Sequence, residues 1–173
     1  LAGWSCGGLQ ALRVAADRRV KTVLMHNTGV LNGGPNTSIA GMDLTKDALR
    51  RWPKAELHVH LEGMVDPATL WTLAERHRTP LYQAGRGALA EVYGTGDFTS
   101  FLGAFKTICE HLREPEDYEL TTYNALRRLA DQNVRYAEVP LAVGVLLWKK
   151  LSVEEVFNAV SAAAAQAHLR LGL

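Results

Sequence analysis

The chain has 173 residues, of which 47% are hydrophobic, and its formal net charge at pH 7 is +1. This length holds one ordinary hydrophobic core. The balanced charge offers neither the basic stripe of a nucleic-acid-binding protein nor the acidic tail of a disordered one. No apolar run reaches the length of a membrane span, and the first residues lack a secretory pattern. The two cysteines, Cys6 and Cys109, lie far apart, which favours reduced thiols and a cytoplasmic protein.

The first fifty residues predict a turn, a helix, a strand and a long loop. Residues 3–7 (Gly-Trp-Ser-Cys-Gly) form the turn, and apolar residues over 9–16 then recur at helical spacing. Residues 20–26 are typical of a buried strand, whereas residues 27–42 are rich in Gly, Asn, Thr and Pro and predict a loop. A short helix is expected over 45–52, because the proline that follows cannot continue it.

The rest of the chain predicts two strands separated by helices. The first strand covers 55–60, and we expect the second to lie parallel to it because a helical crossover connects them. A predicted loop over 78–97 is long enough to be a functional lid. The other elements expected here are a helix from Pro67 to about His77, helices over 98–112 and 115–132, a strand over 134–139 and a last helix that Ser152 opens.

Residues 53–63 (Pro-Lys-Ala-Glu-Leu-His-Val-His-Leu-Glu-Gly) carry the strongest chemical signal in the chain. In a strand, side chains two residues apart point the same way, so His58 and His60 can bind one metal ion. A hydrolytic site also needs further ligands, an open position for water and a base. The alternative is that both histidines are half-buried strand residues with ordinary hydrogen bonds. The pair predicts a metal site of the hydrolase type.

Four segments in the same order resemble the adenosine deaminase family. They are residues 53–63 with Asp-Pro-Ala-Thr-Leu at 66–70, the aromatic helix over 98–105, Leu-Arg-Glu-Pro-Glu-Asp-Tyr at 112–118, and Asn-Val-Arg-Tyr-Ala-Glu-Val at 133–139. The resemblance covers about residues 50–160 and implies a partial, truncated (β/α)8 TIM barrel of the metal-dependent hydrolase type, with zinc at the carboxyl ends of the strands. One departure is Pro140, which stands where the family usually has arginine.

The resemblance also implies roles for individual residues. His58 and His60 would be zinc ligands, Glu62 and the adjacent Gly63 would contact the sugar side of the substrate, and Phe101 and Phe105 would line the purine pocket. Many adenosine-specific members carry aspartate at the position of Glu62, and glutamate appears in relatives that use other purines, including adenine. The substrate is therefore open between adenosine and adenine. The alternative for the two phenylalanines is core packing of an amphipathic helix.

The implied reaction is hydrolytic deamination of a small-molecule purine, in which a zinc-activated water attacks the carbon that bears the amine and ammonia leaves. The family's remaining ligands and its acid/base residues come from later strands. A complete barrel needs roughly 200 residues or more, and only about 120 follow Trp52. We expect this chain to bind zinc weakly, to lack turnover, and to associate with itself through exposed barrel edges.

The segment over 3–7 fits the Gly-x-Ser-x-Gly nucleophile elbow of α/β-hydrolases, and a helix-like run and a strand follow it. Ser5 would be the nucleophile of a serine hydrolase or esterase, but no triad acid and histidine follow in the required order. Residues 1–50 therefore resemble a short α/β-hydrolase-like strand–helix segment, and residues 51–173 a deaminase-like domain. The alternatives are a serine hydrolase fragment, a non-catalytic fusion fragment, and an upstream segment foreign to a deaminase that starts at Met42.

Overall fold

The computed structural model describes residues 11–13, 38–39, 42–43, 50–94 and 97–171. Ser5 and its turn, the predicted strand over 20–26 and most of the predicted helix over 45–52 lie outside the described residues. The deaminase-like part of the chain is described over residues 50–94 and 97–171.

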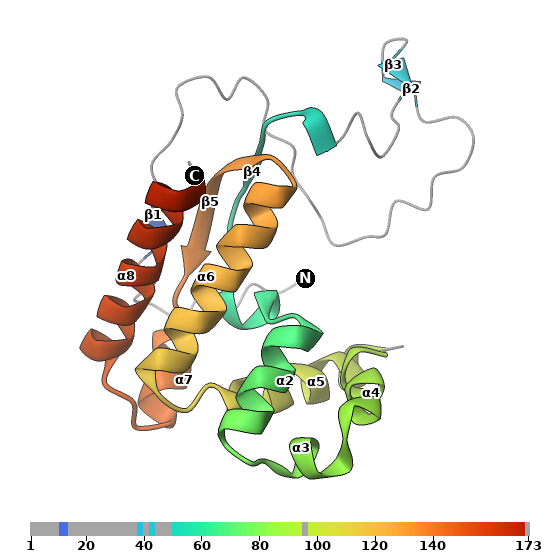
Figure 1. Cartoon of the computed structure of the whole chain (residues 1–173), viewed down its shortest axis with the longest axis vertical. Helices are drawn as coiled ribbons and strands as arrows, with labels where there is room; N and C mark the ends of the chain where they lie inside the picture. The colour runs from blue at the N-terminus through green and yellow to red at the C-terminus, as the bar shows by residue number, and fades with distance from the viewer. Residues whose placement is uncertain (1–10, 14–37, 40–41, 44–49, 95–96, 172–173) are drawn as a thin grey trace.

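A small sheet contains both strands that the deaminase-like segments predict. β4 (Lys54–Glu56) pairs with β5 (Val134–Pro140) in parallel, which confirms the predicted pairing. β1 (Ala11–Arg13) lies antiparallel along the other edge of β5, so that the order is β1-β5-β4 (Figure 1). A separate antiparallel pair joins β2 (Ser38–Ile39) to β3 (Met42–Asp43).

Helices fill the connection from β4 to β5 and follow β5 to the end of the described residues (Figure 1). The first is the short 3-10 helix η1 (Leu61–Met64), directly after the histidine pair. The others, in chain order, are α2 (Pro67–Arg76), α3 (Pro80–Ala84), the 3-10 helix η2 (Arg86–Ala88), α4 (Leu89–Tyr93), α5 (Phe98–His111), α6 (Pro115–Asp131), α7 (Val143–Trp148) and α8 (Val153–Leu171).

Side-chain caps explain where the longer helices begin. The Asp66 carboxylate accepts a hydrogen bond of 2.7 Å from the amide of Thr69 at the start of α2, and Asp97 caps α5 in the same way. The Ser152 hydroxyl oxygen accepts from the amide of Glu155, 3.2 Å away, which confirms the predicted start of the last helix. Each such cap stabilises its helix by about 1 kcal/mol.

The main hydrophobic core lies between the sheet, η1 and the helices that cover them. α6 and α8 lie side by side (Figure 1) and pack against each other. Each fully buried leucine in such a core contributes about 1.5–3 kcal/mol. The buried members of this core are Leu61, Leu73, Leu112, Tyr118, Ala137, Val139, Leu141, Leu146, Val156 and Val160.

Several elements of the structure differ from the sequence predictions. The strand predicted over 55–60 ends at Glu56, because His58 adopts a left-handed φ of 57° that a strand cannot accommodate. Residues 11–13, predicted within a helix, form β1. The helix α7 was not predicted, since its run Val-Gly-Val-Leu-Leu-Trp has no polar face that would reveal a helical period.

The predicted loop over 78–97 contains three short helices where it is described, α3, η2 and α4. Pro80 starts α3, and Gly85, with a φ of 86°, ends it. Leu81, Leu89, Val92 and Tyr93 pack against the buried residues Val65, Leu70 and Ile108. A hydrophobic cluster therefore holds this segment in place. Its closely spaced glycines led to the prediction of a loop, because glycine is typical of turns and loops.

Candidate metal centre and its surroundings

The histidine pair lies on a loop between β4 and η1, not on a strand. The backbone amide of Val59 donates to the carbonyl oxygen of Glu138 in β5 over 3.0 Å, which fixes the loop against the end of the sheet. His58 and His60 are both exposed. Their ring centroids lie 5.2 Å apart with the ring planes at 82°. The two imidazoles therefore lie close together, as predicted. The reason is the left-handed backbone of His58 in this loop, and not the alternation of side chains along a strand.

The donor chemistry of this pair fits zinc. Desolvation and then the neighbouring charge of His58 lower the pKa of His60, which favours the neutral imidazole that binds metals. Catalytic zinc sites use three protein ligands and an open position. Within residues 50–94 and 97–171, no third histidine, cysteine or carboxylate completes a set with the pair. The described residues therefore provide two ligands of the expected type.

Glu62 is the first charged side chain after the pair, and its side chain is 0% exposed. Neither carboxylate oxygen has a hydrogen-bond partner among the described residues. Burial raises the pKa of this carboxyl. The backbone amides of Glu62 and Ala142 and the charge of Lys149 act in the opposite direction, although none of these groups forms a hydrogen bond with the carboxylate. Gly63 is exposed, and its amide donates to the carbonyl oxygen of His60 over 3.0 Å. Contact of either residue with a substrate stays a prediction.

The aromatic face of α5 is open to solvent. Phe101 is 51% exposed and Phe105 is half-buried, and their ring centroids lie 6.4 Å apart. Phe98 and Leu102 extend the same exposed apolar face, with 73% and 48% of their surface accessible. The exposure of Phe101 excludes the alternative that this residue serves core packing. The role of Phe101 and Phe105 in a purine pocket stays a prediction.

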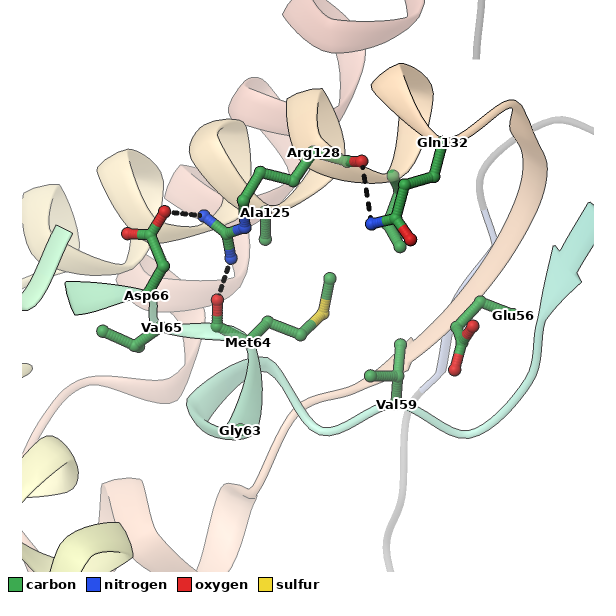
Figure 2. Close-up of a pocket in the computed structure, with 10 residues that line it drawn as sticks. Glu56, Val59, Gly63, Met64, Val65, Asp66, Ala125, Arg128 and Gln132 are labelled. Atoms are coloured by element: carbon green, nitrogen blue, oxygen red, sulfur yellow. Dashed lines mark hydrogen bonds and ion pairs between the residues drawn. The ribbon is translucent and has the colours of Figure 1, made fainter. Parts of the chain in front are cut away.

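A pocket of about 330 Å³ opens beside the histidine loop (Figure 2). The Arg128 guanidinium crosses it, donating to the Asp66 carboxylate over 2.8 Å and to the carbonyl oxygen of Met64. Burial works to raise the pKa of Asp66, but hydrogen bonds from Thr69 and the charge of Arg128 hold that pKa below its usual value. Val59 and Gly63 line the pocket while the two imidazoles do not. Arg128 therefore anchors the chain after η1 rather than offering a free cation.

A second cluster of metal-binding residue types was not predicted. His77, Glu114 and Asp117 place one donor atom each within 4.8 Å of one another, at the joint between α2 and α6. Asp117 is fully buried and accepts from the Arg76 guanidinium and from the His77 imidazole, each over 2.7 Å. The amides of residues 113 and 114 also donate to it. A carboxylate with so many donors has a structural role at this joint. The capping sequence from Glu114 to Asp117 is the sequence signal that could have pointed to it.

The profile of the adenosine deaminase family matches residues 53–173, which is most of the chain. The chain belongs to the adenosine deaminase family. Two curated relatives are the adenine deaminase of Streptomyces coelicolor and the aminodeoxyfutalosine deaminase of Streptomyces avermitilis. The first is 41% identical over 93 residues, and the second is 40% identical over 89 residues. These alignments cover 54% and 51% of this chain but only 27% and 25% of the two relatives.

Two solved structures, an adenine deaminase and an amidohydrolase, resemble the fold. The adenine deaminase of Arthrobacter aurescens has a TM-score of 0.62 at 30% identity, over 68% of this chain and 36% of that chain. A cog1816 amidohydrolase of Burkholderia ambifaria, solved with bound zinc, has a TM-score of 0.62 at 25% identity, over 78% of this chain and 38% of that one. The described part of this family member is therefore a portion of a TIM-barrel type fold. Among its described helices, none combines the length and the apolar character that a membrane crossing requires.

Proposed function

We propose that this chain is the amino-terminal part of a zinc-dependent purine deaminase, which hydrolyses the exocyclic amine of an adenine or adenosine compound and releases ammonia. The observation that carries the proposal is the exposed imidazole pair, with ring centroids 5.2 Å apart, at the carboxyl end of β4 in a chain of this family. Active sites of barrel enzymes lie at this end of the strands. The name of the Streptomyces coelicolor relative, adenine deaminase, supports a purine substrate.

His58 and His60 would hold the zinc ion, which when bound supplies an activated water and polarises the substrate. The hydrogen bond from Val59 to Glu138 holds the loop that carries both imidazoles at the end of the sheet. Phe101 and Phe105 would cover one side of the purine and exclude water from it. Glu62 and Gly63 would lie on the sugar side, as the family resemblance implies.

The described residues supply two zinc ligands, and catalytic zinc sites use three. We therefore propose that the 173-residue chain binds zinc weakly and does not turn over a purine. Purified chain loaded with zinc should release no ammonia from adenine or adenosine above the background of a His58→Ala, His60→Ala double variant. Ammonia release that depends on both histidines would overturn the proposed inactivity.

The metal assignment is tested by titrating the chain with Zn²⁺ or Co²⁺ and following heat or the cobalt absorption bands. Wild type should bind one ion, and His58→Ala and His60→Ala should each abolish saturable binding, because a single imidazole is a weak site. His168→Ala, which removes an exposed histidine on α8, is the matched control and should bind like wild type. Undiminished binding in both loop variants would show that the metal lies elsewhere or that there is none.

Three further features belong to this proposal. The division into an upstream segment over 1–50 and a deaminase-like part over 51–173 is supported by the family match, which begins at residue 53. A cytoplasmic location is supported by the buried free thiol of Cys109. Self-association through the sheet would use β4, the outermost strand on its side. Size-exclusion chromatography over a concentration series measures whether such association occurs.

A further inference from the structure

Two arginines lie over aromatic rings where α2 is followed by α3 and η2. The guanidinium carbon of Arg86 lies 5.1 Å from the centroid of the Trp71 ring, and that of Arg78 lies 5.1 Å from the centroid of the Tyr82 ring. The Arg78 guanidinium also donates to the Tyr82 hydroxyl over 3.2 Å. The two rings lie 5.3 Å apart, with their planes at 43°. These four side chains therefore form one continuous group, which we call the arginine–aromatic array.

The positive charge of the array has no counter-charge in the part of the chain that the structure describes. Arg78 and Arg86 are both exposed, and within residues 50–94 and 97–171 neither guanidinium forms an ion pair with a carboxylate. The surrounding residues 76–90 contain three arginines and no acidic residue. The third arginine, Arg76, is paired with Asp117. The array therefore presents two exposed cations on one short surface segment.

The backbone at Arg78 adopts a conformation that favours glycine. Its φ is 48°, and it ends α2 in a Schellman turn. In this turn the amide of Arg78 donates to the carbonyl oxygen of Glu75 over 3.2 Å, and the amide of Thr79 donates to that of Ala74 over 3.0 Å. Glycine is the usual residue at this position, because a side chain there is strained. The side chain of Arg78, and not the turn, therefore accounts for an arginine at this position.

We propose that the arginine–aromatic array is a binding site for a ligand that carries linked phosphate groups, such as a diphosphate. The planar donors of a guanidinium match phosphate oxygens in pairs, and a guanidinium that lies over a ring keeps the N–H groups at its edge available. The rings also hold both guanidinium groups in place, so that less side-chain freedom is lost on binding. Two cations joined through two rings favour a ligand with more than one anionic group. This site goes beyond the proposed function, because it needs neither the metal nor the histidine loop.

A simpler role for the two arginines is to attach α3 and η2 to α2 through cation–π contacts. The two roles predict different results. Attachment alone predicts that a substitution of either arginine lowers the Tm, and that the chain does not bind phosphate compounds saturably. Arg78→Gly separates the roles, because glycine adopts the backbone of this turn without strain. This variant should lose affinity for the ligand and keep the Tm of wild type.

The experiment titrates the full chain with inorganic pyrophosphate at low salt and follows heat and tryptophan fluorescence. Wild type should bind one pyrophosphate saturably. Arg78→Gly and Arg86→Gln should each raise the dissociation constant about tenfold, because each removes charge-assisted donors. Trp71→Phe should keep the affinity, since a ring remains, but lose the fluorescence change. Arg127→Gln, which removes an exposed arginine on α6, is the matched control and should bind like wild type.

The histidine loop is a second place where pyrophosphate would bind if zinc were present. The chain is therefore freed of metal with a chelator, and the His58→Ala, His60→Ala double variant should bind like wild type, because α3 lies at the end of α2 that is farther from η1 (Figure 1). Arg86→Lys serves if Arg86→Gln does not fold, and it should still weaken binding because an ammonium lacks the paired donors.

Four results would overturn the inference. They are no saturable binding by wild type, loss of binding in the histidine double variant, an equal loss in Arg127→Gln, and binding of succinate as tight as that of pyrophosphate. The last result would show that the array recognises negative charge in general and not phosphate groups. Loss of affinity in Arg78→Gly and Arg86→Gln, with the controls unchanged and succinate bound about tenfold more weakly, would support it.

Discussion

The joint between α2 and α6 allows a quantitative test of how this domain is held together. Asp117 is fully buried at the first turn of α6 and accepts hydrogen bonds from Arg76, His77 and two backbone amides. Replacing it with alanine removes the acceptor for all of them at once. Because α2 follows directly on η1, loosening this joint also frees the element behind the histidine loop.

The size of the effect follows from the partners. Loss of the amide contacts at the start of α6 costs about 1 kcal/mol. The hydrogen bond from the His77 imidazole adds about 1 kcal/mol. The bond from Arg76 is charge-assisted, but its side chain is 36% exposed, so solvent screening reduces its share to about 1 kcal/mol. We expect Asp117→Ala to lower the free energy of unfolding by about 3 kcal/mol, and Arg76→Met, which removes one donor only, by about 1 kcal/mol.

Urea unfolding followed by circular dichroism measures both variants, and equal slopes with urea concentration would show that the denatured states are comparable. Asp117→Asn is the intermediate case, since one oxygen still accepts while the charge is gone. A loss in Asp117→Ala no greater than that in Arg76→Met would refute the reasoning, because it would mean that the buried acceptor adds nothing beyond its ion pair.

Two other predictions concern buried groups near this joint. His111 donates from Nδ1 to the carbonyl oxygen of Thr107 and accepts at Nε2 from the Thr79 hydroxyl, and burial lowers its pKa below 6.5. The folded state therefore takes up fewer protons than the unfolded state, so stability should fall as the pH drops below about 6.5. In His111→Gln the slope of unfolding free energy against pH should shrink but not vanish, because the pKa of His60 is lowered too; an unchanged slope would contradict the assignment. Burial raises the pKa of the Cys109 thiol to about 12. In a Cys6→Ser background at about pH 8 it should react with a disulfide reagent slowly when native and fast in urea, and rapid labelling of the native chain would show that it is not covered.

Sequence patterns predicted the elements whose boundaries local chemistry decides. The aspartate before Pro67 and the serine at 152 were recognised as helix starts, and both act as such. Parallel pairing of the two strands followed from the helical crossover between them and is confirmed. The three short helices over 80–93 were missed, because their stability comes from contacts with Val65, Leu70 and Ile108, which lie elsewhere in the sequence.

The candidate site was predicted in composition but not in geometry. A histidine spacing of two suggested a strand, and the structure instead brings the rings together by one left-handed residue, His58. The burial of Glu62 depends on the packing of η1 against α5 and α6. No short sequence pattern encodes packing between elements so far apart in the chain, so this burial emerges only from the folded chain.

The segment from α2 to α5 is attached to the rest of the domain by two sets of side-chain hydrogen bonds. At the end of α2, the Arg76 and His77 side chains donate to the Asp117 carboxylate. At the end of α5, the His111 imidazole hydrogen-bonds the Thr79 hydroxyl. Residues 80–94 also pack back on the domain through Leu81, Leu89, Val92 and Tyr93, so substitution of these four residues should loosen the segment that follows the imidazole pair. The exposed positions of residues 80–94 are thus the ones where new side chains can be introduced at least cost to the strands and the imidazole pair.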